Sequence, residues 1–172
     1  VYIRDTALEG YNNQKPLDGR MIMIGETNEE ISSYISSVNP DIVGISVLFS
    51  NLMEHAHTLA KIVKQVNPSI KIVLGGNHIS NTVKDYLFAI KHPEAGLENE
   101  LVIIKDKNID YFMKGEVEEQ FLELVNKLIN KEDPIDVEGL VYIKDGQLKI
   151  NNSPASGDIR KLPFPARDLM NM

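Results

Sequence analysis

Small and polar residues follow three apolar runs of the sequence at the places where those runs stop. Ser46-Val47-Leu48-Phe49-Ser50 ends the first run, Gly75-Gly76-Asn77-His78 follows the second, and Gly115-Glu116 follows the third. In an open parallel sheet, ligands bind beyond the carboxyl ends of the strands, where the loops meet helix N-termini. If the three runs are neighbouring strands, these residues lie along one ligand-binding edge.

Each of these strand ends also has a purely structural explanation. Ser50 is of the type that caps a helix N-terminus. Gly75-Gly76 suits a tight turn with positive φ as well as a backbone that lies against a flat ligand. Glu116 lies at a helix start, where the helix dipole favours carboxylates. The residue types alone leave both explanations open.

The sequence contains no cysteine, and its four histidines do not form an evident metal site. The absence of cysteine excludes disulfides, zinc–thiolate sites and cysteine-ligated iron–sulfur clusters within these residues. His55 and His57 are two positions apart on an expected helix and therefore point in different directions. We predict that neither takes part in a metal site, and no metal ligand is assigned in this sequence.

The elements that position the strand ends follow from hydrophobic periodicity. Continuous β-rich runs predict buried strands at 42–49, 70–74 and 109–113. Apolar residues at helical spacing predict helices at 28–38, 52–66, 83–90 and 121–129, the first with a capping box at Thr27 and Glu30. Strands and helices alternate, which predicts an α/β, Rossmann-like (flavodoxin-type) parallel sheet with helices on both faces.

The two ends of the chain depart from this alternation. Val1–Arg4 is expected to be a strand, and residues 5–20 an irregular segment. Strands at 137–143 and 147–151 flank Asp145-Gly146, a strong type I′ turn signal, and predict a β-hairpin appendage. We therefore expect a Rossmann-like domain over 1–132, the appendage over 133–160 and a proline-containing linker over 161–172. Residues 97–107 resemble an insertion without an evident role.

Composition excludes several partners. The formal net charge is −7, and no basic stripe is present that could follow phosphates, so nucleic acid is not an expected partner. No apolar run has the length of a membrane span, and the start does not resemble a signal peptide. These features predict a cytoplasmic protein that does not bind membranes.

The strand ends resemble those of a known family. The spacing of Ser46-x-Leu48 and Gly75-Gly76 matches two parts of the Asp-x-His-x-x-Gly, Ser-x-Leu, Gly-Gly signature of cobalamin (vitamin B12)-binding domains. Further segments are similar to the N-terminal domain of cobalamin-dependent radical S-adenosylmethionine proteins. They are the runs 39–46, 73–78, 110–116, 138–142 with Asp145-Gly146, and 162–169.

This resemblance implies a role for the strand ends. It implies cobalamin as the cofactor, with Ser46 and Leu48 along its nucleotide tail and His78 near that tail. The implied cofactor-binding residues are Ser46, Leu48, Ser50, Gly75, Gly76, His78, Gly115 and Glu116. It also implies a downstream catalytic barrel with a [4Fe-4S] cluster and S-adenosylmethionine, often a methyltransferase. Without cysteine, these residues do not themselves perform that chemistry.

The sequence also departs from the family pattern. Asp5-Thr6-Ala7-Leu8-Glu9-Gly10 imitates the spacing of Asp-x-His-x-x-Gly, but Ala7 stands where the histidine would be, and we do not assign it as the motif. The first strand is instead expected upstream of Val1. Val117 stands where the family usually has glycine.

Two alternative functions follow from these departures. A phosphoacceptor receiver domain shares the architecture, but the end of the run at 42–49 lacks its acidic phosphorylation site. The stronger alternative is a cobalamin-free Rossmann-like module that serves as a docking or substrate-gating surface in the same kind of enzyme. We also expect residues 1–172 alone to bind cobalamin weakly and to self-associate, because a missing first strand leaves unpaired edges.

Overall fold

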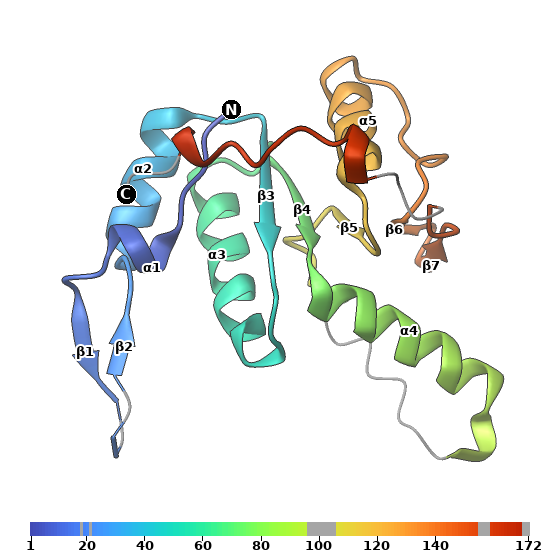
Figure 1. Cartoon of the computed structure of the whole chain (residues 1–172), viewed down its shortest axis with the longest axis horizontal. Coiled ribbons are helices and arrows are strands. Elements are labelled where there is room, and N and C mark those ends of the chain that lie inside the picture. Colours follow the sequence, from blue (N-terminus) through green and yellow to red (C-terminus); the bar gives the residue numbers. More distant parts are fainter. Residues whose placement is uncertain (18, 21, 96–105, 155–158, 170–172) are drawn as a thin grey trace. The chain divides into compact units, whose positions relative to one another are not determined.

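The computed structural model describes residues 1–17, 19–20, 22–95, 106–154 and 159–169. It divides into two compact units (Figure 1). One consists of Val1–Asn39 with Arg160–Met172, and the other of Pro40–Ile159. This division differs from the three segments expected from the sequence, because Val1–Asn39 is grouped with the last residues of the chain and not with the large sheet. The proposed insertion at 97–107 lies almost wholly outside the described residues.

The described residues of the smaller unit contain two α-helices, a two-stranded antiparallel sheet and the 3₁₀ helix Arg167–Leu169. The first elements are α1 (Thr6–Glu9), β1 (Gln14–Pro16), β2 (Ile22–Ile24) and α2 (Asn28–Val38). The capping box predicted for α2 is confirmed, since Thr27 and Glu30 exchange side-chain and backbone hydrogen bonds. The Asp5 carboxylate caps α1 by accepting from the backbone N–H groups of Ala7 and Leu8. Capping explains the aspartate of the motif-like segment without any ligand.

The strand predicted at Val1–Arg4 is wrong, because these residues belong to no strand. Instead, the Arg4 guanidinium donates to the Glu26 carboxylate and lies over the Tyr34 ring, 3.8 Å from its centroid. Residues 5–20, expected to be irregular, contain α1 and β1. Contacts of Arg4 with residues more than twenty positions away decide this conformation, and such contacts leave no local pattern.

The larger unit contains a mixed five-stranded sheet. Its elements are β3 (Ile42–Ser46), α3 (Met53–Val66), β4 (Lys71–Gly75), α4 (Asn77–Lys91), β5 (Tyr111–Met113), α5 (Glu118–Ile129), β6 (Leu140–Lys144) and β7 (Gln147–Ile150). The strand order is β3-β4-β5-β6-β7. The first three strands are parallel and the last two antiparallel to their neighbours. The Rossmann-like α/β fold is thereby confirmed.

The hairpin of β6 and β7 continues the main sheet instead of standing apart from it. Asp145 and Gly146 have φ of 54° and 73°, which confirms the predicted type I′ turn. Register pairs join Phe112 to Val141 and Met113 to Leu140, so β6 lies directly against β5. Leu140 and Val141 are fully buried, and this burial is the physical reason why the hairpin belongs to the core.

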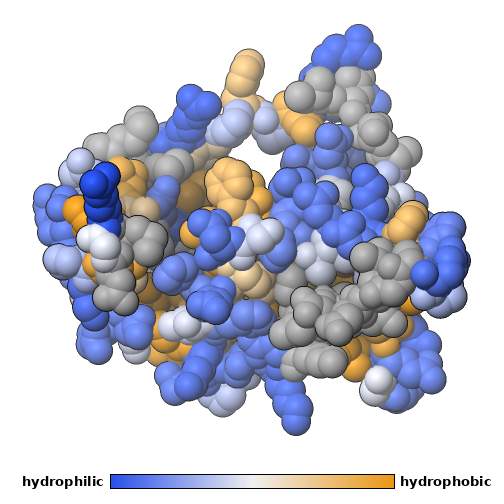
Figure 2. Space-filling view, turned by 90° about the horizontal axis from the view of Figure 1, so that it is seen from below, coloured by the Kyte–Doolittle hydropathy of each residue, from blue (hydrophilic) through white to orange (hydrophobic). Residues whose placement is uncertain are grey.

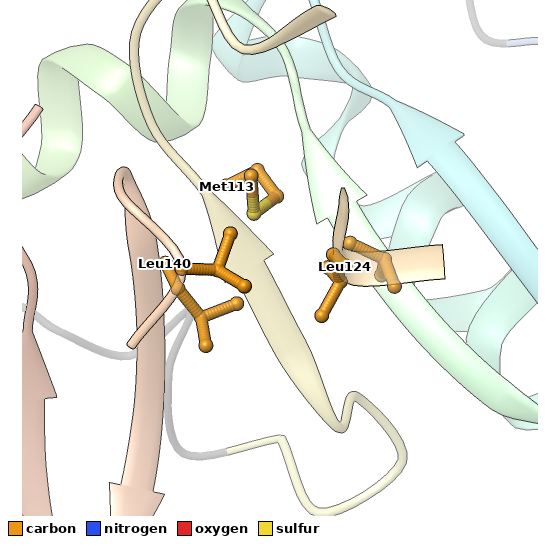
Figure 3. Close-up of a cluster of buried hydrophobic side chains, with 5 residues drawn as sticks. Met113, Leu124 and Leu140 are labelled. Atoms are coloured by element: carbon orange, nitrogen blue, oxygen red, sulfur yellow. The ribbon is translucent and has the colours of Figure 1, made fainter. Parts of the chain in front are cut away.

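Helices cover both faces of the sheet. The crossovers β3-α3-β4 and β4-α4-β5 step in the same direction, so the right-handed rule places α3 and α4 on one face. On the other face, Leu124 of α5 packs in a buried cluster with Met113 and Leu140 (Figure 3). Ile72 and Leu74 point to one face of β4 and Val73 to the other, and all three are buried, as expected for a strand covered on both faces.

Candidate functional site

The carboxyl ends of β3 and β4 are joined by backbone hydrogen bonds. Ser46 and Gly75 are register partners in the two strands. One residue further along, the Val47 N–H donates to the Gly75 carbonyl at 2.8 Å, and the Val47 carbonyl accepts from the His78 N–H at 3.1 Å. The strand end and the first turn of α4 are therefore joined at one edge of the sheet.

A side-chain hydrogen bond adds to this connection. The Ser50 hydroxyl and Nδ1 of His78 are 3.0 Å apart. Neither the short 3₁₀ helix Ser50–Leu52 nor α3 has a side-chain cap, so Ser50 does not act as the helix cap that its residue type allows. Two of the predicted site residues, 28 positions apart in sequence, are thus brought into contact.

The two glycines after β4 have different reasons to be glycine. Gly76 has φ of 101°, and a Cβ there would lie 2.5 Å from the Val47 carbonyl oxygen. Its missing side chain therefore lets the backbones of β3 and α4 approach each other, and does not leave space for a ligand. A Cβ on Gly75 would meet its nearest neighbour, the Met113 carbonyl oxygen, at an ordinary 3.7 Å.

The third strand end is connected to the second through Ser80, a residue that the sequence analysis did not single out. The Ser80 hydroxyl accepts from the Gly115 N–H at 2.9 Å and lies 3.3 Å from the Gly76 carbonyl, to which it donates. Its position in the first turn after a Gly-Gly pair was the available signal. Gly115 has φ of 94°, and Glu116 is exposed.

Apolar side chains stand exposed beside these polar groups. Leu48 is 56% exposed and Phe49, which the sequence analysis did not select, is 66% exposed. Seen from below, towards the edge at which β3 and β4 end, the surface has apolar side chains among polar ones (Figure 2). Hydroxyl and imidazole groups next to exposed apolar side chains suit a large ligand that has both polar and apolar parts.

Two further histidines, His55 and His57, lie on α3. His57 Nδ1 contacts the Asp106 carboxylate, which belongs to the segment before β5. His55 is exposed. Within the described residues, no group of three or more histidine, aspartate or glutamate side chains is arranged to hold a metal ion. In the same part of the chain, no helix is long and apolar enough to cross a membrane.

The fold defines a Rossmann-like domain, a class in which ligands bind at the carboxyl ends of parallel strands. Residues 13–96 match the family model of the B12 binding domain. The match includes β3, β4 and the polar ends of both strands. It ends before β5, so Gly115 and Glu116 lie outside it.

Two curated proteins are similar in sequence. Cytidylyl-2-hydroxyethylphosphonate methyltransferase of Streptomyces wedmorensis is 29% identical over 196 residues, which cover 100% of this chain and 34% of that protein. An uncharacterized methyltransferase of Pyrococcus horikoshii is 31% identical over 149 residues, which cover 85% of this chain and 28% of that protein. The chain thus spans about a third of the length of these relatives.

Solved structures share the fold. The cobalamin-dependent S-adenosylmethionine radical enzyme OxsB with bound aqua-cobalamin has a TM-score of 0.58 at 20% identity, over 83% of this chain and 18% of that chain. The radical S-adenosylmethionine methyltransferase TsrM of Kitasatospora setae, with cobalamin and a [4Fe-4S] cluster, has a TM-score of 0.51 at 14% identity, over 79% of this chain and 23% of that chain. The B12-binding domain of this chain thus shares its fold with a part of each of these enzymes.

Proposed function

We propose that this chain binds cobalamin at the carboxyl edge of β3, β4 and β5 and positions it for the catalytic barrel of a radical S-adenosylmethionine enzyme that transfers methyl groups. The observation that carries the proposal is that hydrogen bonds connect the ends of all three strands. One joins Ser50 to His78, and two others join Gly115 to Gly76 through Ser80. Leu48 and Phe49 are exposed beside them. The family match and the methyltransferase relatives support it.

The residues at this edge have distinct parts in binding. Ser46 is exposed at the end of β3 and offers a hydroxyl to a polar group of the cofactor. Leu48 and Phe49 offer apolar surface to the corrin ring or the nucleotide base, and the Ser50–His78 hydrogen bond fixes the wall beside them. When bound, cobalamin supplies cobalt-centred group transfer, while the protein supplies position and shielding.

The catalytic barrel, its [4Fe-4S] cluster and S-adenosylmethionine belong to this proposal and not to the described residues. The relatives are about three times as long as the chain. Because the sequence has no cysteine, it cannot hold a cysteine-ligated cluster. The chain is therefore proposed to act as the cofactor-holding part of the enzyme.

The test is retention of hydroxocobalamin by the full-length protein, followed by its visible spectrum after gel filtration. Leu48→Asp should abolish retention, because a carboxylate on the apolar wall would be desolvated by the ring. Ile143→Asp is the matched control, since Ile143 is 54% exposed on β6, near the opposite edge. Both variants should keep the wild-type far-UV circular dichroism.

The competing function is a cobalamin-free docking or gating module. Its specific support is the absence of any histidine before His55 and the capping role of Asp5, which leave no axial ligand in this region. A full-length protein that retains no corrinoid under any condition would favour this module and contradict cobalamin binding.

A further inference from the structure

Lys114 is the only charged residue among the buried residues of the described part of the chain. It follows β5 directly, at the edge that holds the proposed cofactor site, and 8% of its surface is exposed. Its ammonium donates to the Ser153 hydroxyl at 2.6 Å. An ammonium has three N–H donors, and within the described residues it meets no carboxylate.

Burial of a cation beside a neutral hydroxyl is unfavourable by itself. Removal from water destabilises the charged form, and this desolvation lowers the pKa of Lys114. Glu26 offers a contrast, since it is only partly buried as a residue but its side chain, 3% exposed, pairs with Arg4. A protein usually places an opposite charge beside such a group, and none of the described residues does so for Lys114.

Backbone hydrogen bonds fix the surroundings of Lys114 without a contribution from its ammonium. The backbone N–H of Lys114 donates to the Gly139 carbonyl at 2.9 Å, and the Gly139 N–H donates to the Asn152 carbonyl at 2.7 Å. A Cβ on Gly139 would lie 2.8 Å from the Lys114 carbonyl oxygen, so the backbones are in close contact. Backbone bonds therefore hold the segment that carries Ser153 at the strand end.

We infer that Lys114 binds the phosphodiester of the cofactor's nucleotide tail. This inference rests on the proposed function and adds a residue to that site. A phosphodiester carries one negative charge and oxygen acceptors that suit an ammonium. Neighbouring strands are about 4.8 Å apart, so the end of β5 lies about 10 Å from Ser46 at the end of β3, within the length of a nucleotide. The Ser153 hydroxyl, beside the ammonium, is a second donor to the same oxygens.

The test compares two corrinoids in the full-length protein. Cobalamin has the nucleotide tail with its phosphodiester, whereas cobinamide has the corrin ring without it. Lys114→Met should weaken cobalamin binding about tenfold or more and leave cobinamide binding unchanged, because a hydrogen bond to a charged group is lost. Lys114→Arg should retain most of the preference for cobalamin. Lys144→Met, an exposed lysine of β6, is the matched control and should bind both corrinoids like the wild type.

The other outcomes of this binding experiment each count against the assignment of Lys114 or redirect it. Equal weakening for both corrinoids, or no weakening for either, overturns the assignment of Lys114. If the wild type binds neither corrinoid, the proposed function fails and the inference fails with it. A thermal stabilisation by inorganic phosphate that requires Lys114, with unchanged cobalamin affinity in Lys114→Met, would assign the ammonium to free phosphate. If Lys114→Met does not fold, Ser153→Ala should still weaken cobalamin selectively, and its failure to do so counts against the inference.

Discussion

Gly76 is the position of the candidate site at which an added side chain would disturb the backbone most. Its φ of 101° and ψ of 177° lie in a region that is nearly restricted to glycine, and a Cβ would meet the Val47 backbone. Gly76→Ala should therefore destabilise the protein by about 2 kcal/mol or more, as measured by urea unfolding. Gly75→Ala, where a Cβ meets only ordinary contacts, is the control and should change stability by less than about 1 kcal/mol. Equal losses in both variants would contradict this account.

The histidines of α3 provide a second prediction at this scale. Because His55 is exposed and His57 contacts Asp106, neither belongs to the joined strand ends. His55→Ala and His57→Ala should leave the corrinoid spectrum of the full-length protein unchanged. A loss of corrin absorbance in either variant would show that α3 takes part in the site.

Residue types predicted which strand ends lie side by side in the sheet, but not which contacts each residue makes there. Ser46, Gly75 and His78 were found because small or polar residues interrupt apolar runs. The contact of Gly76 with Val47 and the bridge through Ser80 depend on strand pairing across distant positions, so no local pattern shows them. Lysine is a residue type that usually lies on the surface, and the burial of Lys114 follows from the placement of the β6–β7 hairpin.

At the scale of elements, Asp110 ties α3 to the starts of β4 and β5. Its carboxylate accepts from Lys64 Nζ at 2.7 Å, Lys71 Nζ at 2.9 Å and the Ile72 N–H at 2.9 Å. Burial is the largest single influence and opposes ionisation, but these hydrogen bonds together hold the pKa of Asp110 below its ordinary value. The same ion pair raises the pKa of Lys71.

This arrangement predicts a stability that depends on pH. Because the folded pKa of Asp110 is lower than the unfolded one, its contribution is fully present above about pH 4 and is lost as the pH falls through the folded value. Asp110→Asn should lower the free energy of unfolding at pH 7 and give a flatter dependence below pH 4. Denaturant unfolding at several pH values measures this, and a variant curve parallel to the wild type would contradict it.

The alternation of strands and helices was predictable because each element has a clear hydrophobic period. The predicted strands at 42–49, 70–74 and 109–113 correspond to β3, β4 and β5, and the hairpin turn at Asp145-Gly146 is correct. Pairing of the hairpin with β5 was not predicted, because a turn signal defines two strands but not their third neighbour. The β1–β2 hairpin was missed because its three-residue strands are exposed and carry no period.

At the scale of the whole molecule, β3 is an edge strand within the described sheet. The Asp41 carbonyl and the N–H and C=O groups of Val47 form hydrogen bonds with β4 and the loop after it. Backbone groups of successive residues in a strand point alternately to its two sides. Ile42, Gly44 and Ser46 therefore direct their N–H and C=O groups away from β4. Such an edge can pair with another strand. We therefore predict that residues 1–172 alone self-associate and bind cobalamin more weakly than the full-length protein.

Light scattering on residues 1–172, with a parallel cobalamin titration, measures both properties. Gly44→Pro removes an outward N–H group without touching the bonds towards β4, and it should reduce the association. A wild-type fragment that remains monomeric at high concentration and binds cobalamin tightly would contradict both predictions.

The reversal of strand direction after β5 places the turn of the β6–β7 hairpin at the end of the sheet opposite to the proposed binding site. Because β6 runs antiparallel to β5 and β7 returns parallel to it, the Asp145-Gly146 turn lies at the edge opposite to Gly115 and Ser153. A Cβ on Gly146 would have open space around it. A peptide tag or a fluorophore placed in this turn would therefore report on the domain from outside the proposed cofactor site, and would follow cobalamin loading without competing for that site.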